Sequence, residues 1–114
     1  MPFINLKTNK EMSKSCEAEL REDFSKHIEL LPGKTDFWLM QCFEDNMRMS
    51  FRSITDEPVA IIEVSLLGAA KKEAYDALTA ALTKSVSEKL GVRSDRIYVK
   101  YSEISTWGYD GENF

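Results

Sequence analysis

Residues 58–68 read PVAIIEVSLLG, an apolar stretch that begins at a proline and ends at a glycine. Alternation of aliphatic and β-branched residues over this length is typical of a strand. One set of alternate positions is Ala60, Ile62, Val64 and Leu66, and the other is Val59, Ile61, Glu63, Ser65 and Leu67. Because the second set is also largely apolar, the sequence predicts a strand that is covered on both faces.

The same order of segments occurs twice along the chain. Residues 2–8 (PFINLKT) predict a strand, an amphipathic stretch follows as far as Gly33, and a strand is expected from Asp36 (DFWLMQCF). In the second half, PVAIIEVSLLG is followed by an amphipathic stretch as far as Gly91 and by a strand from Asp95 (DRIYVKY). The sequence therefore predicts an α+β fold of two β-α-β repeats, and a length of 114 residues fits one domain over residues 1–114.

Both amphipathic stretches have helical periodicity. The apolar positions are Met12, Cys16, Leu20, Phe24, Ile28 and Leu31 in the first and Ala74, Ala77, Leu78, Ala81, Leu82 and Val86 in the second. Thr8 and Glu11 have the spacing of a capping box before the first helix, and Gly91 suits the end of the second. Each helix is apolar on one side, so we expect both to lie on one face of a four-stranded sheet.

Two helices cover only one face of such a sheet, although its strands are apolar on both. We therefore expect an oligomer in which the sheets of several subunits shield one another. Met47, Met49 and Phe51 alternate and predict a short additional strand. The last residues, 103–114, are too few to fold alone and should dock on the rest of the chain.

Composition excludes several classes of function. The net charge of −4 provides no basic surface for nucleic acid, and no apolar run reaches the roughly 18 residues of a membrane helix. The single histidine, His27, cannot form a multi-histidine metal site, and Cys16 and Cys42 form no CxxC motif. Residues 1–14 lack the features of a secretory signal peptide, and two thiols fit a reducing compartment, so we expect a cytoplasmic protein.

Pro2 is the first candidate for chemistry. Initiator methionine is normally removed before a small second residue, which would leave Pro2 with a secondary α-amine. Such amines have a pKa near 8, against about 10.4 for lysine, and burial beside a cation would lower the pKa further toward that of a working base. The structural alternative is that Pro2 only begins an edge strand. If Met1 stays attached, the Pro2 nitrogen is a non-basic amide.

Lys34 and Tyr98 are weaker candidates. Lys34 follows a glycine and precedes an aromatic segment, where it can hold an anion, and the Tyr98 hydroxyl can donate a hydrogen bond to a developing negative charge. A solvated lysine and a half-buried strand tyrosine are the structural alternatives.

Five segments carry a resemblance over nearly the whole chain. They are MPF with Thr8-Asn9, Gly33-Lys34, EPVAIIEVSLLG at 57–68, DRIYVKY at 95–101 and WGYDGENF at 107–114. In this order and spacing they resemble the macrophage migration inhibitory factor family of the tautomerase superfamily. The resemblance implies a homotrimer of β-α-β-β-α-β subunits, each with a four-stranded mixed sheet and additional short strands, around a central channel. It also implies keto-enol tautomerase activity without a metal or organic cofactor.

The resemblance assigns roles to four residues. Pro2 matches the catalytic N-terminal proline of the family, and Lys34 matches its pocket lysine. Leu67 falls where the family has an aliphatic residue whose backbone lines the pocket. Tyr98 matches a pocket tyrosine that the neighbouring subunit supplies.

Three further positions match aromatic wall positions of the family's pocket, and other positions carry residues that differ from those of the family. Trp38, Trp107 and Tyr109 fall at aromatic positions of the wall. Lys100 stands where many relatives have an asparagine, and a cation there would favour a more acidic ligand. Residues 59–62 (VAII) replace the thiol motif of some relatives, so no thiol-redox role is expected.

The resemblance thus implies a phenylpyruvate or dopachrome type of tautomerase that acts on a small aromatic α-keto acid with Pro2 as general base. The alternative is a cytokine-like protein that binds a cell-surface receptor and has a weak or vestigial pocket. That alternative implies export by a non-classical route.

Overall fold

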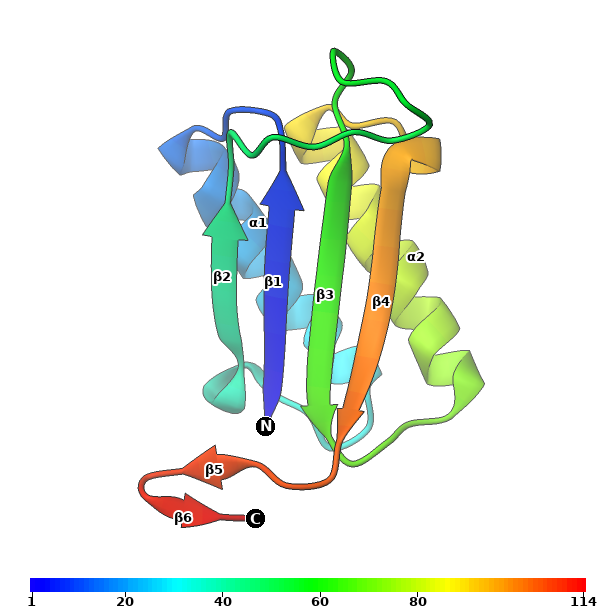
Figure 1. Ribbon diagram of the computed structural model, residues 1–114. Coiled ribbons are helices and arrows are strands. Elements are labelled where there is room, and N and C mark those ends of the chain that lie inside the picture. Colours follow the sequence, from blue (N-terminus) through cyan, green and yellow to red (C-terminus); the bar gives the residue numbers. More distant parts are fainter.

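The computed structural model describes residues 1–114 as one sheet with two helices behind it and a small hairpin below (Figure 1). The main elements are β1 (Pro2–Thr8), α1 (Lys14–His27), β2 (Met40–Glu44), β3 (Ala60–Leu67), α2 (Lys72–Leu90) and β4 (Ile97–Ile104). Three short 3-10 helices are η1 (Ile28–Leu30), η2 (Asp36–Trp38) and η3 (Ser94–Arg96). The hairpin consists of β5 (Gly108–Tyr109) and β6 (Glu112–Asn113). No helix is sufficiently long and apolar to cross a membrane.

The sheet has the strand order β2-β1-β3-β4. β2 runs parallel to β1 and β4 runs parallel to β3, because a helix connects each of these pairs. The two repeats meet where β1 pairs antiparallel with β3, which places Pro2 opposite Leu66. Both helices lie on the same face of the sheet (Figure 1). The predicted α+β fold of two β-α-β repeats with a mixed sheet is confirmed.

The core lies between the sheet and the helices. The predicted inward positions of β3, Ala60, Ile62, Val64 and Leu66, are all buried, and so are Ile4 and Leu6 of β1. Leu20 and Phe24 of α1 and Leu78, Leu82 and Val86 of α2 cover them from the other side. Most positions of the two predicted stripes therefore face the sheet, but Ala77 of α2 is exposed and Met12 precedes α1.

The predicted start of the first helix is wrong. α1 begins at Lys14, and Ser13 caps it by accepting a hydrogen bond from the Cys16 N–H at 3.1 Å. Thr8 cannot cap a helix because it is the last residue of β1, where its buried hydroxyl donates to the Val59 carbonyl at 2.8 Å. The helix also ends earlier than Gly33, since its last turn tightens into η1.

The predicted strand boundaries need three corrections. Residues 36–38 form η2 instead of the start of a strand, and β2 begins only at Met40. Residues 47–51 form no regular strand, and Phe51 makes an isolated bridge to Ile54. β4 likewise begins at Ile97, because η3 precedes it.

The turn between Phe51 and Ile54 contains two non-glycine residues with left-handed backbone angles, Arg52 at φ 54° and Ser53 at φ 59°. This conformation crowds the Cβ atom against the following carbonyl. We expect Ser53→Gly to raise the free energy of unfolding by about 1 kcal/mol, the strain relief exceeding the entropy cost of glycine. Urea denaturation measures this change. Ser53→Ala is the matched control, because alanine keeps the strained Cβ, and an equal stabilisation by alanine would contradict the strain argument.

The second face of the sheet is uncovered in one chain. Phe3, Asn5 and Lys7 of β1 lie on it beside Ile61, Glu63 and Ser65 of β3, and Tyr98 and Lys100 of β4 follow. Glu63 is at the centre of this face and pairs with Lys7 and with Lys100, each at 3.2 Å. These two lysines hold the pKa of the Glu63 carboxyl below its usual range against the opposing effect of burial, so the carboxylate stays charged.

His27 joins the two helices. Its Nε2 lies 2.8 Å from the Ser85 hydroxyl of α2, and burial lowers the pKa of His27 from its ordinary value of 6.5 despite the neighbouring Asp23 carboxylate. The unfolded chain therefore takes up a proton more readily than the folded chain as the pH falls below 6.5. The stability that neutral His27 provides is present above this pH and is lost below it.

We therefore expect the melting temperature of the wild type to fall more steeply below pH 6.5 than that of His27→Asn, which has an amide in place of the titrating ring. His27 is the one histidine of the chain, so the comparison isolates a single group. Parallel pH profiles for the two proteins would contradict this role.

Candidate active site

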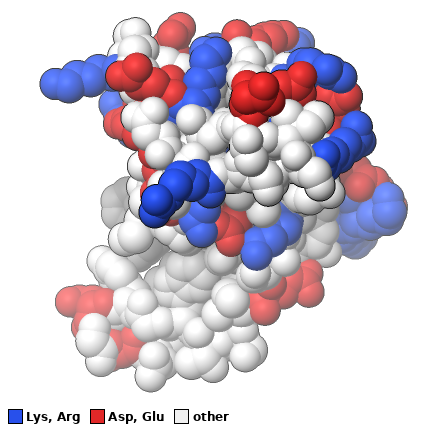
Figure 2. Space-filling view, turned by 45° about the horizontal axis from the view of Figure 1, so that its top comes forward, with Lys and Arg blue, Asp and Glu red and all other residues white.

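A cavity of about 720 Å³ opens at the end of the sheet where β1 begins. Four residues predicted for the site line it: Pro2, Trp38, Trp107 and Tyr109. The rest of its wall is formed by Met1, Phe3, Phe37, Leu39, Met40, Ser65, Ile104 and Gly108. The wall is mainly apolar, and charged side chains gather instead over the upper part of the molecule in Figure 2. Such a cavity suits a ligand with an aromatic or other apolar group.

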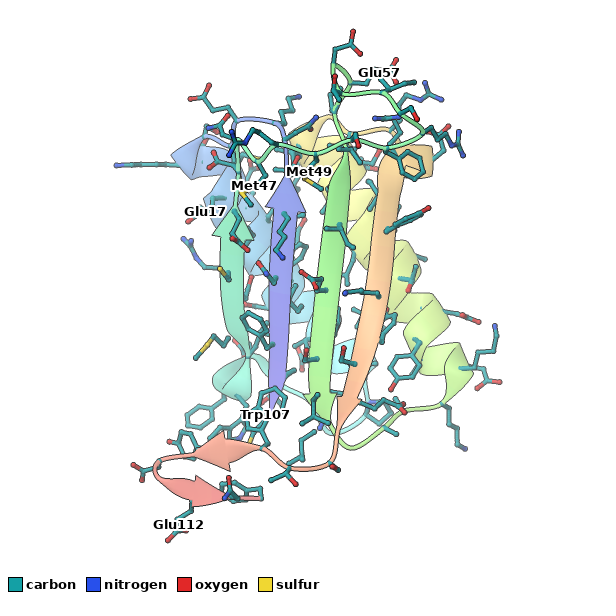
Figure 3. All side chains as sticks on the ribbon, viewed as in Figure 1. Glu17, Met47, Met49, Glu57, Trp107 and Glu112 are labelled. Atoms are coloured by element: carbon teal, nitrogen blue, oxygen red, sulfur yellow. The ribbon has the colours of Figure 1, made fainter.

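The C-terminal hairpin supplies one side of the cavity. The Trp107 and Phe114 backbones exchange two hydrogen bonds, at 3.2 and 2.8 Å, and the turn between them contains Asp110 at φ 52° and Gly111 at φ 81°. An Asp-Gly pair with two left-handed residues is typical of a tight hairpin. Trp107 consequently lies beside the first residues of β1 in Figure 3.

The aromatic side chains of the cavity contact one another edge to face. Tyr109 meets Trp38 with ring centroids 5.0 Å apart, and Trp38 meets Phe37 at the same separation. This geometry is favourable for aromatic pairs. The predicted docking of the C-terminal residues is thereby confirmed, because Tyr109 packs on the segment that precedes β2.

Lys34 and Leu67 lie next to the N-terminus. The Lys34 ammonium donates to the Leu67 carbonyl at 2.9 Å, and the Leu67 N–H donates to the Met1 carbonyl at 3.1 Å. Pro2 is buried at the start of β1, opposite Leu66. Burial, and then the charge of Lys34, lower the pKa of the Met1 α-amine from its ordinary value of 8.0. An amine at this end of β1 is therefore biased toward its neutral, basic form.

Tyr98 and Lys100 lie far from this cavity within one chain. Tyr98 is opposite Ile61 on β3 and Pro2 is opposite Leu66, so the two are separated along the strands by about 17 Å. Tyr98 is 60 % exposed. Both residues project from the uncovered face of the sheet, so only a second subunit could bring them to a pocket of this kind.

The sequence did not predict some of the residues that line the cavity. It also did not predict that Lys100 forms an ion pair. Phe37 and Met40 flank Trp38 and contribute to the same wall, and Ser65 reaches the cavity from β3. Glu63 stands directly opposite Lys100 in the register of β3 and β4. Pairing the predicted outward positions of these two strands could have found that contact, since parallel strands align such residues.

Comparisons with known proteins agree with this geometry. The family model for macrophage migration inhibitory factor (MIF) matches residues 1–114. The crystal structure of Leishmania major MIF2 is similar with a TM-score of 0.92 at 24% identity, over 100% of this chain and 97% of that chain. The homologue from Prochlorococcus marinus has a TM-score of 0.88 at 26% identity, over 98% of each chain.

A further solved structure is that of a protein inactivated by 2-oxo-3-pentynoate, with a TM-score of 0.85 at 17% identity over 96% of this chain and 93% of that chain. No curated protein sequence matches the chain. Two β-α-β repeats with a pocket at the start of β1 define a protein of the tautomerase superfamily. The chain belongs to the macrophage migration inhibitory factor family, as its five sequence segments predict.

Proposed function

We propose that this protein is a keto-enol tautomerase of small aromatic α-keto acids, of the phenylpyruvate type, and that Pro2 is its general base after Met1 is removed. Membership of the family supports a tautomerase-like function in general terms. The observation that carries the specific proposal is the position of the Met1 α-amine, which is subject to the Lys34 charge at the edge of an aromatic cavity that Pro2 also lines. Removal of Met1 would create the Pro2 amine one residue further along, at the start of β1. A neutral amine, a cation and an apolar wall are what the enolisation of an aryl α-keto acid requires.

In this mechanism the Pro2 nitrogen takes a proton from C3 of the keto acid, the carbon between the ketone and the aryl group, and its ammonium form then returns a proton to the carbonyl oxygen to give the enol. The reverse direction uses the same groups. Lys34 binds the substrate carboxylate, and the aromatic walls formed by Trp38, Trp107 and Tyr109 hold the aryl group and exclude water. No other reactant is consumed, since the proton only changes position.

Loss of Met1 frees the Pro2 amine, and it also changes a backbone hydrogen bond. The Leu67 N–H now donates to the Met1 carbonyl, so removal of Met1 leaves this donor without its partner. A free backbone N–H beside Lys34 can then donate to a substrate oxygen, where charge accumulates in the transition state. The same processing step therefore produces both the base and a hydrogen-bond donor.

We also propose that the pocket is complete only in a homotrimer, in which Tyr98 of a neighbouring subunit reaches it and Lys100 lies at its edge. Phe3, Ile61 and the exposed Tyr98 on the uncovered face of the sheet support such an assembly. The central Lys7, Glu63 and Lys100 would remain ion-paired in it. Because Lys100 is paired with Glu63, its charge is partly compensated and its effect on substrate choice should be smaller than that of an isolated cation. Light scattering should give three times the 13.1 kDa of one chain, and a monomer would contradict the shared pocket.

Labelling with 2-oxo-3-pentynoate tests the identity of the base. A neutral amine adds to the conjugated alkyne, forming a C–N bond while its proton passes to the adjacent carbon. We expect one label for each chain on the peptide that begins with Pro2, and protection by excess phenylpyruvate. Mass spectrometry of peptides locates the label. A label confined to Cys16 or Cys42, or a fully retained Met1 in the purified protein, would refute the proposal.

A further inference from the structure

We infer that Arg96 is a positioning residue, which acts through Phe51 to hold the ring of Tyr98 in the orientation that a neighbouring subunit's pocket uses. The inference rests on the proposed function, because that function is what gives Tyr98 a role. The contacts themselves lie within one chain, at the end of the sheet opposite Pro2.

Arg96 is a buried cation. Its side chain is 4 % exposed, Nε donates to the Pro58 carbonyl at 2.8 Å, and Nη1 donates to the Phe51 carbonyl at 3.4 Å. Nη1 also lies 3.6 Å from the Glu57 carboxylate. Burying a guanidinium costs free energy unless such partners are present. Arg96 therefore connects the two ends of the 51–58 loop, which rises above β3 and β4 around Glu57 in Figure 3.

Phe51 links Arg96 to Tyr98. The guanidinium carbon of Arg96 lies 5.3 Å from the centre of the Phe51 ring, and Phe51 meets Tyr98 edge to face with centroids 5.2 Å apart. The three side chains border a small cavity of about 180 Å³ together with Ile61. Tyr98 is largely exposed, so its contact with the Phe51 ring can restrain the orientation of its own ring.

The backbone next to Phe51 is strained, which is the second observation behind the inference. Arg52 and Ser53 both have positive φ, and the Phe51 and Ile54 backbones close the turn with hydrogen bonds of 3.1 and 3.0 Å. Such a conformation persists only where surrounding contacts impose it. The bond from Arg96 to the Phe51 carbonyl is one of those contacts, so it fixes the ring position of Phe51 as well as the turn.

The test compares Arg96→Met with Arg52→Met. Arg52 also lies over the Phe51 ring, at 5.1 Å, but it is exposed and makes no ion pair or side-chain hydrogen bond, so it is a matched control. The first measurement is the chemical shift of the Tyr98 ring by NMR. The resonance that is missing from the spectrum of Tyr98→Phe identifies this ring. We expect Arg96→Met to move this resonance toward the position of a free tyrosine ring, because the ring current of Phe51 no longer acts on it. Arg52→Met should leave the resonance in place.

The second measurement is kcat/KM for phenylpyruvate tautomerisation. Arg96→Met should lower it by about three- to tenfold, which is the range expected for losing one aromatic contact. In a Tyr98→Phe background the same substitution should add no further loss. Additive losses, or an unchanged Tyr98 resonance in Arg96→Met, would overturn the inference.

The two proposals can fail separately. A wild type without tautomerase activity refutes the proposed function, and the Tyr98 resonance still decides the role of Arg96. If Arg96→Met does not fold, Arg96→Lys and Phe51→Leu replace it. Lysine keeps the charge but cannot donate to both carbonyls from Nε and Nη1, and leucine removes the ring that connects Arg96 with Tyr98. A Tyr98 resonance that neither variant moves would equally overturn the inference.

Discussion

Replacing Pro2 with glycine should lower kcat/KM for phenylpyruvate by at least about 100-fold, which is the lower end of what a positioned general base contributes. Glycine retains an α-amine after Met1 is removed, but this primary amine lacks the pyrrolidine ring, which is buried at the start of β1 and would restrict the position of the nitrogen. The loss therefore reflects positioning and basicity together. Enol absorbance at constant pH measures the rate.

A protein with one added residue before Pro2 should be measured together with Pro2→Gly. It leaves every side chain of the cavity in place and converts the Pro2 nitrogen into an amide, which has no basic lone pair. We expect its activity to be lower than that of Pro2→Gly, while the mass by light scattering stays unchanged. Equal rates for the wild type, the glycine variant and the extended protein would show that the base lies elsewhere.

Replacing Lys34 with methionine should have the second largest effect on tautomerase activity. The substitution should change both KM and the pH dependence of the rate. A hydrogen bond from a charged donor contributes roughly 1.5–3 kcal/mol, so KM for phenylpyruvate should rise by about one to two orders of magnitude. The acid limb of the pH profile should also move to higher pH. The reason is that burial, and then the Lys34 charge, lower the pKa of the Met1 α-amine. We expect the same charge to act on the Pro2 amine that replaces it, so removal of the charge lets that amine hold its proton to a higher pH.

Lys34→Arg separates these effects. Arginine keeps the positive charge, so the acid limb of the profile should stay near that of the wild type even if the altered geometry raises KM. A Lys34→Met enzyme with an unmoved acid limb would contradict the electrostatic role, and one with an unchanged KM would contradict carboxylate binding.

The fold was largely predictable because strand and helix periodicity report burial directly. The inward positions of residues 59–67 face the core as expected, and so do most positions of both helix stripes, with Ala77 as an exposed exception. The errors arose where local patterns admit two interpretations. Phe37 and Trp38 continue the apolar pattern of β2, but they form η2, which directs their rings to the cavity instead of the sheet. Thr8 and Glu11 match a capping box, but pairing with β3 keeps Thr8 in a strand.

The candidate site was predictable in part for a related reason. Pro2, Trp38, Trp107 and Tyr109 line one cavity, and Lys34 and Leu67 do not line it but lie next to Met1, which does. No local pattern could have revealed that the C-terminal hairpin folds onto the start of β1, and only the family resemblance placed its residues there. Tyr98 and Lys100 lie elsewhere on the sheet, and they would reach the pocket only in the homotrimer that we propose. Glu63 became visible as the partner of Lys100 only through the register of β3 and β4.

The central claim is that a neutral proline amine lies at the edge of the aromatic cavity, and nitrogen NMR of protein labelled with ¹⁵N-proline tests it most directly. The chain has three prolines, and Pro32 and Pro58 are amides at every pH, so a free Pro2 gives the one proline nitrogen that titrates. We predict that this signal titrates with a pKa below the ordinary α-amine value of about 8 and that Lys34→Met raises it. Three amide signals, or a Pro2 amine that titrates at or above the ordinary value, would contradict the account.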